Sequence, residues 1–366
     1  MPLKGKIFLD LDENGTSWFV IKKTNWDFFM KKFYFQLIFA FIFLILTVVT
    51  SLGLGFVKIP FFEIIKIILS KLTGIRYDNI SNIHLSVVWD VRLPRIICAA
   101  LVGASLSVCG VVFQGILLNP LADPYTLGIS AGAAFGASVA LLFGFNFLGI
   151  YSVPFFAFVF GLITLFVVIY LSSTSSGGIS SNNLILSGVI VSAILSAGIS
   201  FCKYLAQERV SVIVFWLLGS FASSTWTSAL LIMISLLISF GIFIFYFREL
   251  NLLSLGGKTA LSMGVDPNRV RILLLVFGSL LTGVCVSFSG IIGFVGLLVP
   301  HMMRSVVGPN HLKLLPISLI CGAIMLTMAD TLTRAVLPTE VPIGVLTALI
   351  GGPFFCYIFR KKQVGF

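Results

Sequence analysis

One stretch of 79 residues, from Pro124 to Cys202, contains no Asp, Glu, Lys or Arg. A helix needs about 20 predominantly apolar residues to cross the roughly 30 Å hydrocarbon core of a bilayer, so this stretch can hold three crossings. Four further stretches also lack charge: residues 33–57, 96–122, 210–247 and 272–303. Hydrophobic residues make up 58% of the chain and charged residues only 10%. Soluble proteins have about 25% charged residues. The sequence therefore predicts an all-α membrane protein that crosses the bilayer several times.

The apolar segments and the Gly, Pro and charged residues between them predict about ten transmembrane helices. Residues 1–32 form a polar tail before the first helix, and residues 33–362 form one transmembrane domain. The amphipathic segment 60–71 is expected to lie flat on the membrane interface. The ten expected spans are 33–57, 96–118, 126–146, 152–171, 184–203, 228–247, 270–289, 292–307, 314–333 and 341–359.

Basic residues orient this arrangement, because cytoplasmic loops are enriched in Lys and Arg. With ten spans and the N-terminal tail in the cytoplasm, 15 of the 24 basic residues lie inside and nine lie outside. Counting residues 210–226 as an eleventh crossing would leave seven inside and 17 outside. We therefore expect this segment to be re-entrant or interfacial on the outer face, and both termini to be cytoplasmic.

Several function classes are disfavoured by the same sequence. The net charge of +11 comes from basic residues that lie mostly between apolar spans, and they form no continuous basic face for nucleic acid. The six cysteines have no metal-ligand or disulfide spacing. Gly256-Gly257-Lys258-Thr259 resembles the end of a phosphate-binding loop, but the expected first glycine is replaced by Leu252. We expect no catalytic residues, no metal site and no cofactor, and do not expect the chain to be an enzyme.

Glycine spacing predicts close helix packing. Small residues at every fourth position let two helix backbones approach each other in lipid. This pattern occurs in the third span, and nearly so in the second span. A pore lined by exposed carbonyl groups is the less favoured alternative. In the connection between these spans, Asp123-Pro124 is expected to cap the start of the third span. The residues of the two stripes are Gly128, Gly132 and Gly136 in the third span, and Gly103, Ser107, Gly110 and Gln114 in the second.

Three polar features have both a structural and a functional interpretation. Arg92 and Arg95 precede the second span, where they could extend to the interface or bind carboxylates of a partner. Asp330 and Arg334 are one turn apart, so they could form a local ion pair or a functional site within the membrane. The basic loop 248–271 includes a short helical stretch, and could be a plain connector or a contact for a partner protein.

Four ordered strings carry a resemblance to a known family. They are VRLPR at 91–95, GVVFQGILLNPLADPYTLGISAGA at 110–133, GIIGFVGLLVPHMMR at 290–304 and ADTLTRAVLPTEVPIGVLTALIGGPFF at 329–355. From about Val91 to Lys362 the chain resembles the FecCD-type permeases, the transmembrane subunits of ATP-binding-cassette (ABC) importers for iron–siderophore complexes, haem and cobalamin. The resemblance implies a type II, cobalamin-permease-like bundle in a bacterial or archaeal cytoplasmic membrane.

The resemblance also implies partners and roles for particular residues. A second permease copy, in a homodimer or a heterodimer, would enclose the path for the cargo. Arg92, Arg95 and Arg334 would meet acidic residues of an extracytoplasmic substrate-binding protein, and charge reversal there should weaken docking without unfolding the bundle. A coupling loop would contact cytoplasmic ABC ATPase subunits, and the fifth span would line the path. The coupling residues are Gly256, Gly257, Lys258, Ala260, Gly264 and Asp266, and the path residues are Ser187, Ser192, Ser196 and Ser200.

The expected function is therefore import of an intact iron chelate, either a siderophore complex or haem, powered by a separate ATPase. Cobalamin is the alternative cargo. An ion-coupled secondary transporter is the main rival from another class, but it would require ionisable residues near the middle of the membrane. The third, fourth and fifth expected spans contain almost none. An integral membrane enzyme is a second rival, for which the sequence offers no catalytic constellation.

Overall fold

The computed structural model describes residues 23–55, 57, 59–74, 81–173, 179–335 and 340–364 of the chain. Most of the expected polar tail, residues 1–22, lies outside this part, as do the side chains of Lys361 and Lys362. The chain forms two compact units, residues 1–39 and 40–366. The second unit contains the later part of α1 (Lys23–Gly53) and all the helices that follow it.

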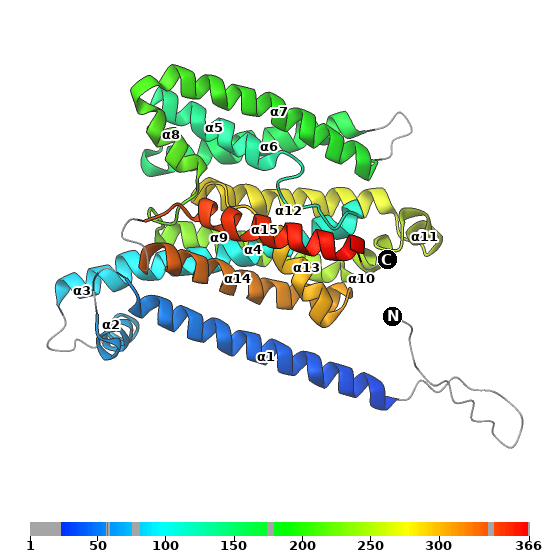
Figure 1. Cartoon of the computed structure of the whole chain (residues 1–366), viewed down its shortest axis with the longest axis horizontal. Helices are drawn as coiled ribbons and strands as arrows, with labels where there is room; N and C mark the ends of the chain where they lie inside the picture. The colour runs from blue at the N-terminus through cyan, green and yellow to red at the C-terminus, as the bar shows by residue number, and fades with distance from the viewer. Residues whose placement is uncertain are drawn as a thin grey trace, which may run out of the picture. The chain divides into compact units, whose positions relative to one another are not determined.

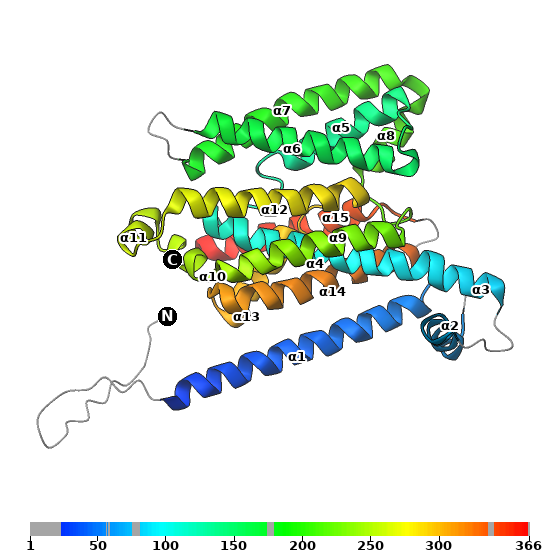
Figure 2. The ribbon, with the colours of Figure 1, turned by 180° about the vertical axis from the view of Figure 1, so that it is seen from behind.

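The second unit is a bundle of helices that run side by side, as Figures 1 and 2 show. We call its two ends the α3 end and the α11 end, after the helices that lie there. Short helical turns join some of the helices: η1 (Val87–Arg92), η2 (Gly149–Tyr151) and η3 (Gln207–Arg209). The helices after α1 are α2 (Phe61–Thr73), α3 (Asn82–Ser86), α4 (Leu93–Leu117), α5 (Ile129–Phe143), α6 (Ser152–Ser172), α7 (Ser181–Ala206), α8 (Val210–Leu217), α9 (Trp226–Phe245), α10 (Phe247–Leu253), α11 (Gly257–Ser262), α12 (Pro267–Ser289), α13 (Val295–Val307), α14 (His311–Ala335) and α15 (Ile343–Val364).

Within the described ranges, seven helical segments are long and apolar enough to cross a membrane. Three shorter apolar helices accompany them: α5, α13 and the part of α15 from Ile343 to Tyr357. Each of these ten segments overlaps one of the ten expected spans, so the all-α, multi-pass prediction is confirmed. The amphipathic segment 60–71 also forms a helix, α2, which Glu63 ties to His84 of α3 at 2.7 Å.

Helix α4 is the centre of the bundle. Of its 25 residues 21 are buried, and it contacts α9, α12, α13 and α14. A helix that is apolar on all sides is stable only where other helices surround it. The sequence LPRIICAALVGASLSVCGVVFQGIL has this character, since Gln114 is the largest polar side chain after Arg95. The helix therefore spans the second unit from the α3 end to the α11 end.

The glycine stripes mark close helix contacts, as the spacing predicted. A side chain at Gly103 would collide with the backbone of Gly322 in α14, and one at Gly110 with the backbone of Gly296 in α13. In the same way, Gly136 of α5 faces the backbone carbonyl of Phe156 in α6. Because no side chain fits between these backbones, the stripes serve packing.

Helix α5 is shorter than the expected span 126–146. It begins after Gly128 and ends before Gly144, and both glycines adopt left-handed backbone conformations. The expectation that Asp123 caps this helix is wrong. Its carboxylate instead accepts hydrogen bonds from the amides of Tyr125 and Thr126, at 3.0 and 2.9 Å, and stabilises a turn before the helix.

Residues 210–226 do not form a crossing of their own. Helix α8 has eight residues, which corresponds to about 12 Å, and it contacts both α5 and α7. The chain then turns at Gly219, whose carbonyl accepts from the Ile343 amide at 3.2 Å, while Ser220 donates to the Ser289 carbonyl at 2.9 Å. These bonds hold the segment against the ends of α12 and α15, as expected for a re-entrant or interfacial piece.

Candidate functional site

The three predicted docking arginines gather at the α3 end, although they are distant in the sequence. Arg92 ends η1, Arg95 lies in the first turn of α4, and Arg334 lies in the last turn of α14. All three are buried, with 5%, 9% and 6% of their surface exposed. The sequence correctly placed them at one end but gave no sign of this burial.

Arg92 and Arg334 hold the end of α1. Arg92 donates to the carbonyls of Leu52 and Val57 at 2.8 and 2.5 Å. Arg334 donates to the carbonyls of Ser51 and Leu54, the latter at 2.6 Å. The last carbonyls of a helix have no partner within the helix and attract cations. The two guanidinium groups thus cap α1. The sequence predicted that charge reversal leaves the bundle folded; from these contacts we expect it to destabilise the fold.

Arg95 forms an ionic cluster with two carboxylates. Its guanidinium lies 3.0 Å from Asp330 and 3.1 Å from Glu340. Asp330 is almost completely buried, and it also forms an ion pair with Arg334 at 3.4 Å. The predicted local ion pair is therefore present, in addition to the pair with Arg95. Glu340 is 43% exposed in its side chain. It is therefore the member of the cluster that most readily exchanges its partner.

A cavity of about 150 Å³ adjoins this cluster. The charged groups in its wall are Arg95, Asp330 and Glu340, and hydroxyl and apolar groups complete it. The α3 end thus presents a small opening beside an arginine whose charge is already balanced. The other lining residues are Phe215, Ser220, Phe221, Thr333, Val341, Pro342 and Ile343.

The predicted coupling residues form a compact turn at the α11 end. Gly256 and Gly264 have φ angles of +108° and +83°, which favour glycine. Between them α11 packs through Ala260, which is fully buried, while Lys258 is exposed. Asp266 caps α12 by accepting from the amides of Asn268 and Arg269 at 3.0 and 3.3 Å. Gly257 opens α11, so the structure brings the whole predicted set together.

The same segment exposes three large apolar side chains that the sequence reasoning missed. Leu255, Leu261 and Met263 are 66%, 63% and 59% exposed. They lie in the connection between α9 and α12, outside the helical segments that are long enough to cross a membrane. The signal available in the sequence was the presence of apolar residues on a short helix within a basic loop. Exposed apolar side chains with polar residues around them mark an interaction surface.

The predicted path serines of α7 do not all lie on one surface. Ser187 is buried and Ser192 is half-buried, whereas Ser196 and Ser200 are exposed. The neighbouring Gly188 packs against the backbone of the turn before α5. Of the four serines, only Ser196 and Ser200, in the second part of α7, are exposed.

The turn before α5 contains a perturbed carboxyl group. Burial raises the pKa of Asp123 from its ordinary value to about 6, although the hydrogen bonds from Tyr125 and Thr126 act in the opposite direction. Burial also raises the pKa of the Tyr125 hydroxyl, which donates to the Ile292 carbonyl at 2.8 Å. Asp123 is thus partly protonated near neutral pH.

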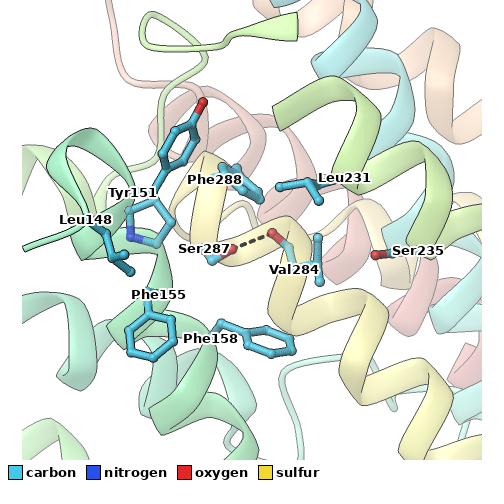
Figure 3. A pocket seen from close by; sticks show the side chains of 10 residues that line it. Leu148, Tyr151, Phe155, Phe158, Leu231, Ser235, Val284, Ser287 and Phe288 are labelled. Atoms are coloured by element: carbon cyan, nitrogen blue, oxygen red, sulfur yellow. Dashed lines mark hydrogen bonds between the residues drawn. The ribbon is translucent and has the colours of Figure 1, made fainter. Parts of the chain in front are cut away.

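A second cavity, of about 270 Å³, lies between α6, α9 and α12 (Figure 3). Aromatic side chains, including Phe155, Phe158 and Phe288, line it together with the hydroxyl groups of Ser235 and Ser287. Ser287 donates its hydroxyl proton to the Val284 carbonyl at 2.8 Å. No charged group and no residue of α7 lines this cavity, so it is separate from the predicted path serines.

Comparisons with known proteins agree on one family. The model of the FecCD transport family matches residues 43–361. The molybdate import permease of Haemophilus influenzae is 38% identical over 88% of this chain and 94% of its own length. The cobalamin import permease of Halobacterium salinarum is 42% identical over 76% of this chain and 74% of its own.

A solved structure is similar to this chain in both fold and sequence. It is described as a metal-chelate-type ABC transporter in an inward-facing conformation, and it is 37% identical in sequence. Its TM-score is 0.77, with 89% of this chain and 98% of the other chain covered. Members of the family are permease subunits rather than enzymes. The match across most of the sequence, together with the ten apolar helices, shows that this chain belongs to the FecCD transport family.

Proposed function

We propose that this chain is the membrane-spanning subunit of an ABC importer that carries an intact iron chelate, a siderophore complex or haem, into the cytoplasm. In this proposal two copies of the chain enclose the path. A separate ATPase binds the α11 end on the cytoplasmic side. A substrate-binding protein delivers the cargo to the α3 end on the outside.

The observation that carries the proposal is the exposed apolar tip at the α11 end, formed by Leu255, Leu261 and Met263. An interface needs a central apolar anchor surrounded by polar groups. Lys258 and Arg269 supply exposed charge around this tip. An ATPase that receives α11 in a groove could therefore move it when nucleotide binds.

The ionic cluster at the α3 end supports docking of a receptor. Arg95 already binds two carboxylates, and Glu340 is the exposed one. A receptor carboxylate would exchange with Glu340 at little net cost, because one carboxylate–arginine pair replaces another. Arg92 and Arg334 would act through the positive charge that they add to this end, since their own donors are used on α1.

One observation favours a chelate over a small ion: the solved relative with a TM-score of 0.77 is described as a metal-chelate-type transporter. Cobalamin remains the second candidate because a cobalamin permease is 42% identical.

Uptake experiments test this proposal directly. Cells that contain the complete importer are given one radioactive cargo in each assay: an iron–siderophore complex or haem labelled with iron, cobalamin labelled with cobalt, or molybdate labelled with molybdenum. A protonophore removes the proton-motive force while glycolysis maintains ATP. We expect uptake of an iron chelate to continue under these conditions and to stop when ATP is depleted.

The controls separate the class of transporter from the cargo. An ion-coupled transporter would lose uptake with the protonophore, and that result would contradict the proposal. Uptake of cobalamin or molybdate alone would instead contradict only the choice of cargo. Cells without the chain show the background of each assay.

A further inference from the structure

Arg271 is a buried arginine whose positive charge has no acidic partner among the described residues. It lies in the first turns of α12 and is only 8% exposed. Its donors bind backbone carbonyls of two other elements: Nε binds Ile116 at 3.2 Å, and Nη1 binds Ile179. A buried charge is expensive unless hydrogen bonds compensate it, so its position is tightly determined by these two bonds.

One carbonyl belongs to the last turn of α4, and the other to the chain just before α7. Ile116 lies in the last turn of α4, where the carbonyls have no partner within the helix. It also receives the Ser181 hydroxyl at 3.4 Å. Ile179 lies two residues before α7 and is held twice, because its amide donates to the Asn268 side chain at 3.2 Å. The first turns of α12 therefore bind α4 and the chain entering α7.

The same turns of α12 continue directly into the segment with the apolar tip. The Val265 amide donates to the Ala260 carbonyl at 3.0 Å, which links α11 to the residues just before α12. Asp266 then caps α12 through Asn268 and Arg269. Hydrogen bonds thus form a continuous series from α11 through the start of α12 to the end of α4 and the chain entering α7.

We infer that Arg271 is the positioning residue that transmits movement of α11 to α4 and α7. The inference rests on the proposed function, in which an ATPase moves α11. Only arginine offers a planar fork of donors that can bind two carbonyls in different directions while remaining charged. Lysine in the same place would keep the charge but could not hold both carbonyls with a fixed geometry.

Spin-label distances in the assembled complex test the transmission without knowledge of the cargo. Ser262→Cys reports on α11 and Asn183→Cys on the start of α7; both positions are exposed. The exposed native Cys356 is replaced by Ala. In a homodimer each label gives one distance between the two copies. The probe is ATP with orthovanadate and Mg²⁺, compared with the nucleotide-free complex.

With Arg271 present, we expect both distances to change when nucleotide binds. With Arg271→Gln, we expect the change at residue 262 to persist and the change at residue 183 to be lost. With Arg271→Lys, we expect the distance change at residue 183 to be smaller than in the parent complex. Arg209→Gln is the matched control, because Arg209 is an exposed arginine just beyond the opposite end of α7. It should behave like the parent chain.

Each other outcome has a definite meaning. If residue 183 moves fully in Arg271→Gln, the inference is overturned while the proposed function stands. If residue 262 does not move even in the parent complex, the proposed coupling to an ATPase fails first. If Arg271→Gln does not assemble, Arg271→Lys, which keeps the buried charge, provides the test. A full response at residue 183 in Arg271→Lys would then overturn the inference.

Discussion

At the scale of single residues, Asp123 should give the protein a measurable pH dependence. Burial raises its pKa to about 6, so the native state binds a proton that the unfolded state releases between about pH 4 and 6. Its contribution to stability is therefore present in acid and is lost as the pH rises through 6. The shift corresponds to about 3 kcal/mol.

The substitution Asp123→Asn isolates this effect, because the amide oxygen can still accept from Tyr125 and Thr126 while carrying no charge. We expect the unfolding temperature of the parent protein in detergent to fall more steeply between pH 5 and 7.5 than that of the variant. Two parallel curves across this range would show that the carboxyl group does not titrate there.

Arg334 is a second residue whose surroundings set a clear expectation. Arg334→Gln removes bonds to α1 and leaves the buried Asp330 with less positive charge nearby. Breaking a buried ion pair costs about 3–5 kcal/mol. We expect a lower unfolding temperature, measured by intrinsic fluorescence, whereas the exposed Arg248→Gln should change it little. If both variants lowered the unfolding temperature equally, the buried contacts of Arg334 would contribute nothing to stability.

At the scale of elements, α11 is too short to be stable alone and is held by its neighbours. Its ends are fixed by Gly256 and Gly264, and its buried side rests on Ala260. An isolated helix of six residues would not form in water. The apolar side chains on its outer side are therefore presented in one fixed arrangement, as an interface requires.

Leu261 is the natural place to test this interface. A charge at an apolar anchor typically weakens binding by 2 kcal/mol or more, or roughly 30-fold. We expect Leu261→Asp to reduce the amount of ATPase that co-purifies with the chain by at least about tenfold. Leu261→Met, which keeps size and polarity, should retain it. Normal recovery of the ATPase with the aspartate variant, at unchanged thermal stability, would place the interface elsewhere.

At the scale of the whole molecule, α4 links the two ends. Its first turn carries Arg95, which belongs to the ionic cluster at the α3 end. Its last turn carries Ile116, which Arg271 binds at the α11 end. Because α4 is buried along its length between glycine contacts, it can move only together with its neighbours. This arrangement suits a permease whose two ends must respond to each other.

The sequence by itself determined the membrane class, about ten crossings, the glycine contacts and the family. Each of these depends on local composition, since an apolar segment of sufficient length has a single stable environment. The sequence also grouped the three arginines at one end and residues 256–266 in one loop, and the structure brings each group together. It failed at Arg334, which binds a carbonyl 280 positions away. It also failed at Asp123, which stabilises a turn rather than a helix, although the amides that it binds are only two and three residues further on.

Only the tertiary structure decided whether a charge near a span faces outward or inward. Arg92, Arg271 and Arg334 are buried because backbone carbonyls accept their hydrogen bonds. Every residue has a backbone carbonyl, and those outside regular helix interiors are free to accept from a side chain. A side-chain pattern does not reveal which carbonyls will be free and nearby. That depends on where helices end and which ends meet, and these are properties of the assembled bundle.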